Sequence, residues 1–213
     1  MRISKAGVAC LRAAALAALL APAGGDAYVV TITAGTRSIY LQVGAGTMTG
    51  GYFSAGGTPG NNATRNNVTV TVPAASLGTG TLTMSTDSTV VNSPYDGYAF
   101  CPSATPQTYV YVGGFYRTPG AASNATLTVT SPASLVSGAN TLPFNQISWV
   151  SGGNGDATAT IPSGTFAGGS TQTILSVTRN TWFESCLQFQ YANSAVFPAG
   201  TYSNTVTYTL TVP

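Results

Sequence analysis

The chain has 213 residues, no His, seven Lys or Arg and five Asp or Glu, so that charged residues make up only 6% of it. This inventory excludes most chemistry, because zinc-type sites use His and Cys, a Ser or Thr nucleophile needs a base, and nucleic acid needs several cations on one face. We therefore expect no enzyme, no cofactor, no metal site and no nucleic acid partner.

Residues 1–23 have the features of a secretory signal peptide. A basic start precedes an apolar run over 13–20, and a small-x-small cleavage signal ends at Ala23, with cleavage after Ala27 as the alternative. The apolar run is far shorter than the roughly 20 residues needed to span a bilayer. We therefore expect a protein that crosses the periplasm, is extracellular or lies on the cell surface, and does not insert into the membrane after cleavage.

Cleavage changes both the charge and the cysteine count. The leader carries Arg2, Lys5 and Arg12, so four of the seven basic residues remain against five acidic ones. Beyond the leader, Cys101 and Cys186 form an even pair, which predicts a disulfide in an oxidising compartment. The two cysteines are 85 positions apart, and closing a loop of that length would stabilise the fold by about 4 kcal/mol. The alternative is two separate buried thiols.

The pattern of the remaining chain predicts short strands separated by Gly, Pro, Asn and Ser. Apolar residues show no helical periodicity after residue 24. Ten runs alternate with period 2 or are rich in β-branched residues: 28–33, 38–43, 67–72, 81–85, 109–112, 126–130, 147–150, 173–177, 186–191 and 205–212. Residues 44–67 are expected to form a loop with one short strand at 52–53, and 91–106 a crossover loop or a linker.

This pattern predicts an all-β, antiparallel, immunoglobulin-like β-sandwich over residues 24–213. It is either one large sandwich or two tandem small ones, because a faint internal repeat suggests a division into 24–107 and 108–213. The segment 152–156, Gly-Gly-Asn-Gly-Asp, is expected to be a hairpin turn, since a single carboxylate cannot supply a calcium site.

The C-terminal segment is the most specific feature of the sequence. Gly200 and Tyr202 precede a strand in which Val206, Tyr208 and Leu210 alternate with Thr. This ending resembles the closing strand of secreted bacterial β-sandwich subunits of the spore coat U and archaic chaperone–usher pilus group. The resemblance covers about the last 17 residues and implies a pilus- or coat-type subunit that uses a periplasmic chaperone.

The start of the mature chain is a second candidate for assembly. Tyr28, Val30 and Ile32 would face one side of a free, alternating segment. Such a segment can be added as a strand to the sheet of a neighbouring subunit. The alternative is that 28–33 is simply the first strand of its own domain.

Aromatic residues suggest a different role, contact with a glycan. Two short motifs combine rings with charged neighbours, and their candidate residues are Tyr95, Asp96, Tyr98, Phe115, Tyr116 and Arg117. The alternative is ordinary packing of rings in a sandwich. The acids Asp87, Asp96, Asp156 and Glu184 are all expected in turns, so no pair of carboxylates across a cleft is expected.

Together these features favour an exported structural or adhesive surface protein of fimbrial type, whose partners are copies of itself or other surface subunits. The alternative is a monomeric secreted carbohydrate-binding module.

Overall fold

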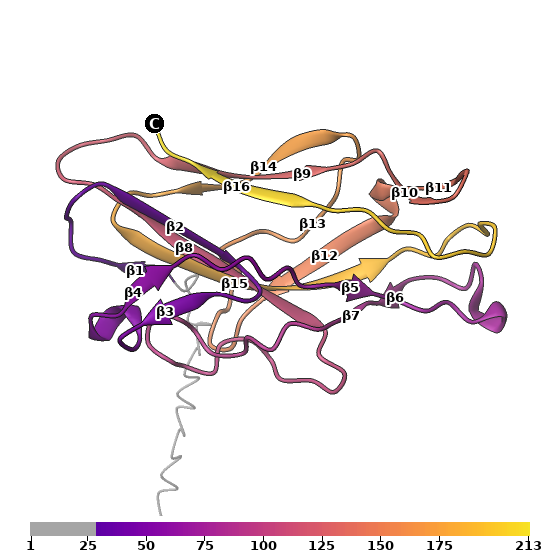
Figure 1. Cartoon of the computed structure of the whole chain (residues 1–213), viewed down its shortest axis with the longest axis horizontal. Helices are drawn as coiled ribbons and strands as arrows, with labels where there is room; N and C mark the ends of the chain where they lie inside the picture. The colour runs from indigo at the N-terminus through magenta and orange to yellow at the C-terminus, as the bar shows by residue number, and fades with distance from the viewer. Residues whose placement is uncertain (1–28) are drawn as a thin grey trace, which may run out of the picture.

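The computed structural model describes residues 29–213, so the predicted signal peptide, its cleavage sites and Tyr28 lie outside the described part. The predicted fold class is confirmed: the described chain is an all-β protein whose strand pairs are antiparallel. Figure 1 shows a smaller sheet above a larger one, with loops and short strands below the larger sheet. No helix within residues 29–213 is long and apolar enough to cross a membrane.

The larger sheet has the strand order β13-β12-β15-β8-β2, and two short strands, β1 and β6, also pair with β15. Its strands are β1 (Val29–Thr31), β2 (Ser38–Val43), β6 (Leu82–Thr83), β8 (Tyr109–Arg117), β12 (Ile147–Gly152), β13 (Gly164–Thr165) and β15 (Thr181–Tyr191). Because β2 pairs with β8, strands from both sides of residue 107 share one sheet, and the halves suggested by the repeat are not separate sandwiches.

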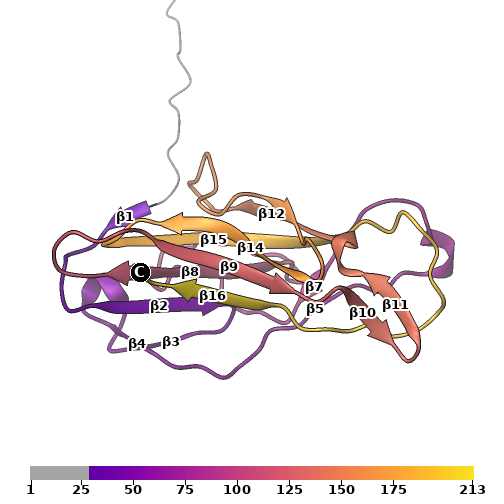
Figure 2. The same ribbon diagram turned by 90° about the horizontal axis from the view of Figure 1, so that it is seen from above.

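The smaller sheet consists of β14 (Ser170–Val177), β9 (Ala125–Ser131) and β16 (Thr207–Thr211), with β9 in the middle. Figure 2 shows these three strands lying over the larger sheet. The remaining strands form three two-stranded pairs: β3 (Thr47–Thr49) with β4 (Thr58–Gly60), β5 (Val68–Thr69) with β7 (Ser85–Thr86), and β10 (Ser134–Ser137) with β11 (Asn140–Pro143). The described part of the chain also contains three 3-10 turns: η1 (Phe53–Ala55), η2 (Ala74–Ser76) and η3 (Phe144–Gln146).

The main core lies between the two sheets and follows from period-2 alternation. Leu127 and Val129 of β9 point into it from the smaller sheet, and Leu187 and Val112 from the larger sheet; all four are fully buried. Burying each such side chain contributes about 1.5–3 kcal/mol. On the outer face of the smaller sheet, hydroxyl residues stand in register across all three strands.

These hydroxyl residues form three rows of three. Reading from β14 through β9 to β16, the rows are Thr171–Thr130–Thr207, Thr173–Thr128–Thr209 and Ser176–Thr126–Thr211. Along β16 itself, Thr207, Thr209 and Thr211 are exposed while Leu210 is buried. The alternation predicted for 205–212 is therefore present, with the apolar residues on the core side.

The larger sheet is unusual because its central strands are covered on both faces. Along β15, Phe183, Leu187 and Phe189 face the main core, whereas Trp182 and Cys186 belong to separate clusters on the opposite face. A strand that is buried on both faces loses the simple alternation of apolar and polar residues. This explains why the sequence predicts only 186–191 where the strand begins at Thr181.

Two predicted features differ in the structure. The expected short strand at 52–53 is wrong: Phe53 begins a 3-10 turn that Gly56 ends in a left-handed conformation, with φ of 93°. In the predicted strand 67–72 only Val68–Thr69 pairs, although Val70 and Val72 still pack on the main core. The segment 152–156 contains the expected turn, in which the Asp156 N–H donates to the Gly153 carbonyl at 3.2 Å.

Candidate functional site

The predicted disulfide between Cys101 and Cys186 is present, with 5.5 Å between the two Cα atoms. It joins the loop before β8 to the middle of β15. Phe100 and Tyr111 are fully buried beside it. The segment 91–106 is therefore an ordered crossover loop fixed to the outer face of the larger sheet, and not a linker between domains.

The C-terminal strand β16 lies at an edge of the smaller sheet. It pairs with β9 through the register Thr207↔Thr130 to Thr211↔Thr126, and it has no second strand partner among the residues that the structure describes. Of the predicted assembly residues, Leu210 is buried, and Val206 and Tyr208 pack against the main core. Burial raises the pKa of the Tyr208 hydroxyl well above its ordinary value.

The N-terminal candidate segment pairs within its own chain. Val30 lies opposite Trp182 of β15, and the Ile32 N–H donates to the Asn180 carbonyl at 2.9 Å. Ile32 is buried in an aromatic cluster and Val30 packs against it. In the single chain the segment is thus the first strand of its own domain, the alternative that the sequence leaves open.

The six candidate glycan residues do not all come together. Tyr95, Phe115 and Arg117 line one depression, at the end of the molecule where β2 begins and β8 ends. Tyr116 is 1% exposed and packs in the main core, because neighbouring residues of a strand face opposite sides. The Tyr98 side chain is 53% exposed but does not line the depression.

Asp96 has a local structural role in a tight turn. Its Oδ1 accepts a hydrogen bond from the Tyr98 N–H at 2.9 Å. Gly97 follows with φ of 83°, and a Cβ there would lie 2.3 Å from the ring of Tyr52. This turn closes a hairpin over 92–99 that carries Tyr95 to the depression.

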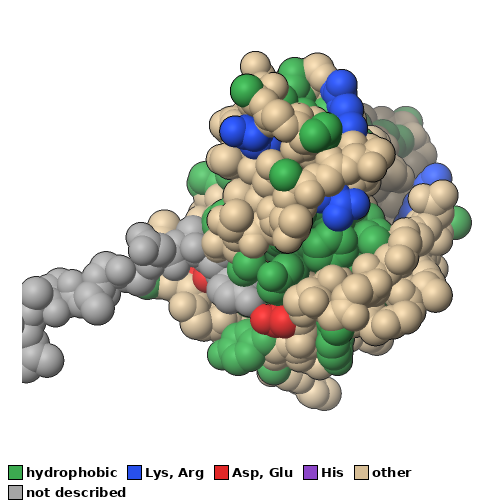
Figure 3. Space-filling view, turned by 90° about the vertical axis from the view of Figure 1, so that its left-hand side faces the viewer, with side chains coloured by type: hydrophobic (Ala, Val, Ile, Leu, Met, Phe, Trp, Pro, Cys, Tyr) green, Lys and Arg blue, Asp and Glu red, His purple; other side chains and the backbone are tan. Residues whose placement is uncertain are grey.

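The depression has a volume of about 610 Å³ and lies between the larger sheet and the loops below it. Figure 3 views this end of the molecule and shows hydrophobic side chains gathered beside Lys or Arg side chains. Three rings form its wall: the centroid of Phe53 lies 4.8 Å from that of Phe115 and 6.3 Å from that of Tyr95. The Thr31, Ser54 and Thr58 side chains add hydroxyl groups to the lining.

Behind the rings, Glu184 is fully buried in the middle of β15, and the expectation that it lies in a turn is wrong. Its Oε2 accepts three hydrogen bonds, from Ser93 at 2.8 Å, Tyr111 at 2.6 Å and Trp182 at 3.0 Å. Burial outweighs these bonds and raises the pKa of Glu184 above its ordinary value of 4.5. The carboxyl group joins the 92–99 hairpin to the sheet and so positions Tyr95.

Sequence reasoning missed Glu184 and Phe53 as parts of this region. The available signal for Glu184 was a lone acid inside the otherwise apolar run Trp-Phe-Glu-Ser-Cys-Leu over 182–187. A carboxyl group in such a run is rarely buried unless it is hydrogen-bonded. Phe53 lies in a Gly-rich segment with no strand pattern, so nothing in the sequence placed it beside Phe115.

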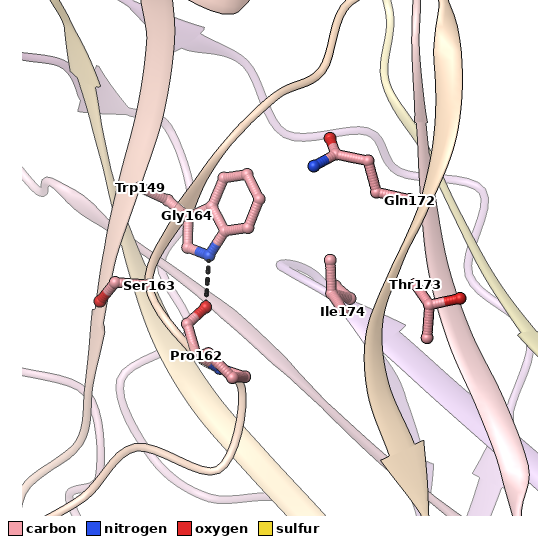
Figure 4. A pocket seen from close by; sticks show the side chains of 7 residues that line it. All are labelled: Trp149, Pro162, Ser163, Gly164, Gln172, Thr173 and Ile174. Atoms are coloured by element: carbon pink, nitrogen blue, oxygen red, sulfur yellow. Dashed lines mark hydrogen bonds between the residues drawn. The ribbon is translucent and has the colours of Figure 1, made fainter.

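A second, smaller cavity of about 190 Å³ lies beside Trp149, between β12 and β14. Figure 4 shows its lining, with the Trp149 Nε1–H donating to the Pro162 carbonyl. The amide of Gln172, on the opposite wall, bonds to the backbone at Thr165 and Ala167. The Trp149 and Gln172 side chains of this cavity therefore bond to the protein itself, and we assign the cavity no role.

Within residues 29–213 no three His, Cys, Asp or Glu side chains are grouped as a metal site would need. Comparisons with protein-family models, with curated proteins and with solved structures find no match to this chain.

Proposed function

We propose that the protein is an exported structural or adhesive surface protein, a pilus- or coat-type subunit that assembles with copies of itself or with other surface subunits by β-strand pairing. The observation that carries this proposal is the outer edge of β16, which lacks a strand partner in the described chain. Proteins commonly protect such edges with Lys, Pro or a bulge. The five residues Thr207–Thr211 contain no Lys or Pro, and their register with β9 is continuous.

The outer face of the smaller sheet supports the same function. Its three rows of Thr and Ser side chains carry no charge, so packed copies would face little electrostatic repulsion. Surface charges are screened by salt, whereas backbone pairing and apolar burial are not. We therefore expect self-association that is nearly insensitive to ionic strength, and a periplasmic chaperone would cover the β16 edge before assembly.

Size measurement and negative-stain imaging of the chain from residue 24 test this proposal. We expect filaments or large oligomers that persist when the salt concentration is raised. Thr207→Lys, on β16, places a charge at the edge and should abolish assembly. Its control is Thr130→Lys, because Thr130 lies opposite Thr207 on the same face but on the middle strand.

Two outcomes would contradict edge pairing. If the wild-type protein stays monomeric at every concentration, assembly through the β16 edge is contradicted. Equal loss of assembly in Thr207→Lys and Thr130→Lys would indicate contact through the Thr face instead. Donation of residues 28–33 to another copy stays a prediction. In the single chain Val30 pairs with β15 and Ile32 is buried in the aromatic cluster, so donation would require both residues to leave these positions.

A second candidate function, carbohydrate binding by the monomer, is favoured by one observation. Tyr95, Phe115 and Arg117 come from segments far apart in the sequence and line the same depression. Aromatic walls with a few polar groups are typical of small-molecule sites. Glycan-array binding by monodisperse protein would support this function, and filaments that bind no glycan would contradict it.

A further inference from the structure

Two polar atoms at the rim of the larger sheet are buried without a hydrogen-bond partner. They are Nε of Arg117 and Oγ of Ser38. Ser38 and Arg117 lie directly opposite each other, as the first residue of β2 and the last residue of β8. Both residues line the 610 Å³ depression. Buried polar atoms are nearly always paired, so two unpaired ones at the same cavity point to a missing partner.

The guanidinium group of Arg117 is held in place by apolar contacts and not by an acid. Its Cζ lies 5.9 Å from the centroid of the Phe115 ring, within the range of a cation–π contact. On another side the backbone of Gly35 approaches closely, since a Cβ there would lie 3.4 Å from Nε. No carboxylate of the described chain bonds to Arg117, so its positive charge is available to a ligand.

We propose that Arg117 and Ser38 bind the carboxylate of an acidic sugar, a uronic acid residue, in this depression. The proposal rests on the carbohydrate-binding function and names its ligand class. A guanidinium group donates two parallel hydrogen bonds to a carboxylate. Nε of Arg117 is covered by protein, so the Nη groups of the side chain donate first, and Nε–H becomes a donor when the side chain turns toward the ligand. Ser38 lies opposite Arg117 across the strand pair, and its covered hydroxyl would turn toward the depression to donate a further bond to the same group.

The remainder of the depression fits a sugar ring better than a bare anion. About 610 Å³ is within the usual range of ligand sites, and far exceeds what one carboxylate or phosphate group fills. Phe53 and Tyr95 provide aromatic faces for the apolar side of a pyranose ring, and Thr31 and Thr58 provide hydroxyl partners for its rim. A single cation also matches a carboxylate, which carries one charge, better than a phosphate, which carries up to two.

Binding of D-glucuronate, D-glucose and inorganic phosphate to the monomeric protein, followed by NMR, tests the proposal. We expect glucuronate to bind at least tenfold more tightly than glucose, since a charge-assisted bidentate pair is worth more than one neutral hydrogen bond. Arg117→Gln should remove this preference, and Ser38→Ala should reduce it by several-fold. The matched control is Arg65→Gln, which removes one charge from a residue that does not line the depression.

Each result decides between the possibilities, provided that thermal unfolding shows the variants to be folded. Equal binding of glucose and glucuronate would overturn the acidic-sugar proposal and leave carbohydrate binding in place. Phosphate that competes as strongly as glucuronate would overturn the sugar part of the assignment. Absence of binding by both sugars would overturn the proposal and the carbohydrate-binding function together, while the assembly function would stand.

Discussion

The two faces of the larger sheet are both buried, but by different means. Toward the smaller sheet, aliphatic and aromatic side chains such as Leu127 and Leu187 meet in a continuous core without buried charge. On the opposite face, loops cover the sheet, and the contacts are rings, a disulfide and the buried carboxyl group of Glu184. The inner face gains its stability from apolar area, whereas the outer face depends on a few specific bonds.

The disulfide should give the largest effect on the outer face. Replacing both cysteines in Cys101→Ser/Cys186→Ser should lower the free energy of unfolding by about 4 kcal/mol, because the bridge closes a loop with a sequence separation of 85. Urea unfolding followed by tryptophan fluorescence measures this. Reduced wild-type protein should match the double variant, which should itself be insensitive to reductant. A loss below about 1 kcal/mol would show that the loops hold to the sheet without the bridge.

A deletion in the main core should cost somewhat less. Leu127 is fully buried near the centre of β9. Leu127→Ala should therefore lower the free energy of unfolding by about 3 kcal/mol. The same urea experiment measures it, and Leu77→Ala, at an exposed site, is the control. Since the two faces rely on separate contacts, this loss should add to that of the disulfide variant. A strongly non-additive result would show that the contacts of the two faces are energetically coupled.

Glu184 should give a smaller effect that depends on pH. Its pKa is raised in the folded state, so its contribution to stability is complete below the ordinary value of 4.5 and is lost as the pH rises through the folded pKa. Glu184→Gln keeps the shape and removes the titration. The variant should therefore match the wild type at low pH and exceed it in unfolding temperature at higher pH.

A control with the opposite sign is available for this measurement. Hydrogen bonds from Asn66 and Asn67 hold the pKa of Asp87 below its ordinary value of 3.8, so its contribution is lost as the pH falls. Asp87→Asn should lower the unfolding temperature near neutral pH. The gain in stability that Glu184 gives as the pH falls toward 4.5 should be unchanged in this variant. Parallel pH profiles for Glu184→Gln and the wild type would contradict the role assigned to the buried carboxyl group.

How far the sequence predicts this structure differs between the two faces. The alternation of 126–130 is clear because β9 has one apolar and one hydroxylated face, and the prediction lies within a residue of each end of β9. The prediction 38–43 matches β2, although both faces of β2 are covered. The two central strands were predicted too short. Thr181–Ser185 lacks alternation because both faces are covered, and Gly113 and Gly114 suggest a turn although they lie inside β8.

The glycines of β8 have a physical reason that only the folded sheet reveals. A Cβ on Gly114 would lie 2.0 Å from the Tyr40 carbonyl oxygen, and one on Gly113 would lie 2.3 Å from the Tyr111 hydroxyl. These positions therefore need residues without side chains. The candidate site was predictable in part: Tyr95, Phe115 and Arg117 were identified, but Ser38 and Phe53 come from segments whose sequence carries no signal for it.

The Cys101–Cys186 bond also determines how the molecule would respond to mechanical force. If the two ends of one subunit are pulled apart, the load passes through the covalent bridge and bypasses the 85-residue interval between the cysteines. Only the segments before Cys101 and after Cys186 can then be drawn out, while β8, β9 and β14 carry no tension along the chain. A fibre built from such subunits would have a limited, defined extension per subunit, set by the position of the two cysteines.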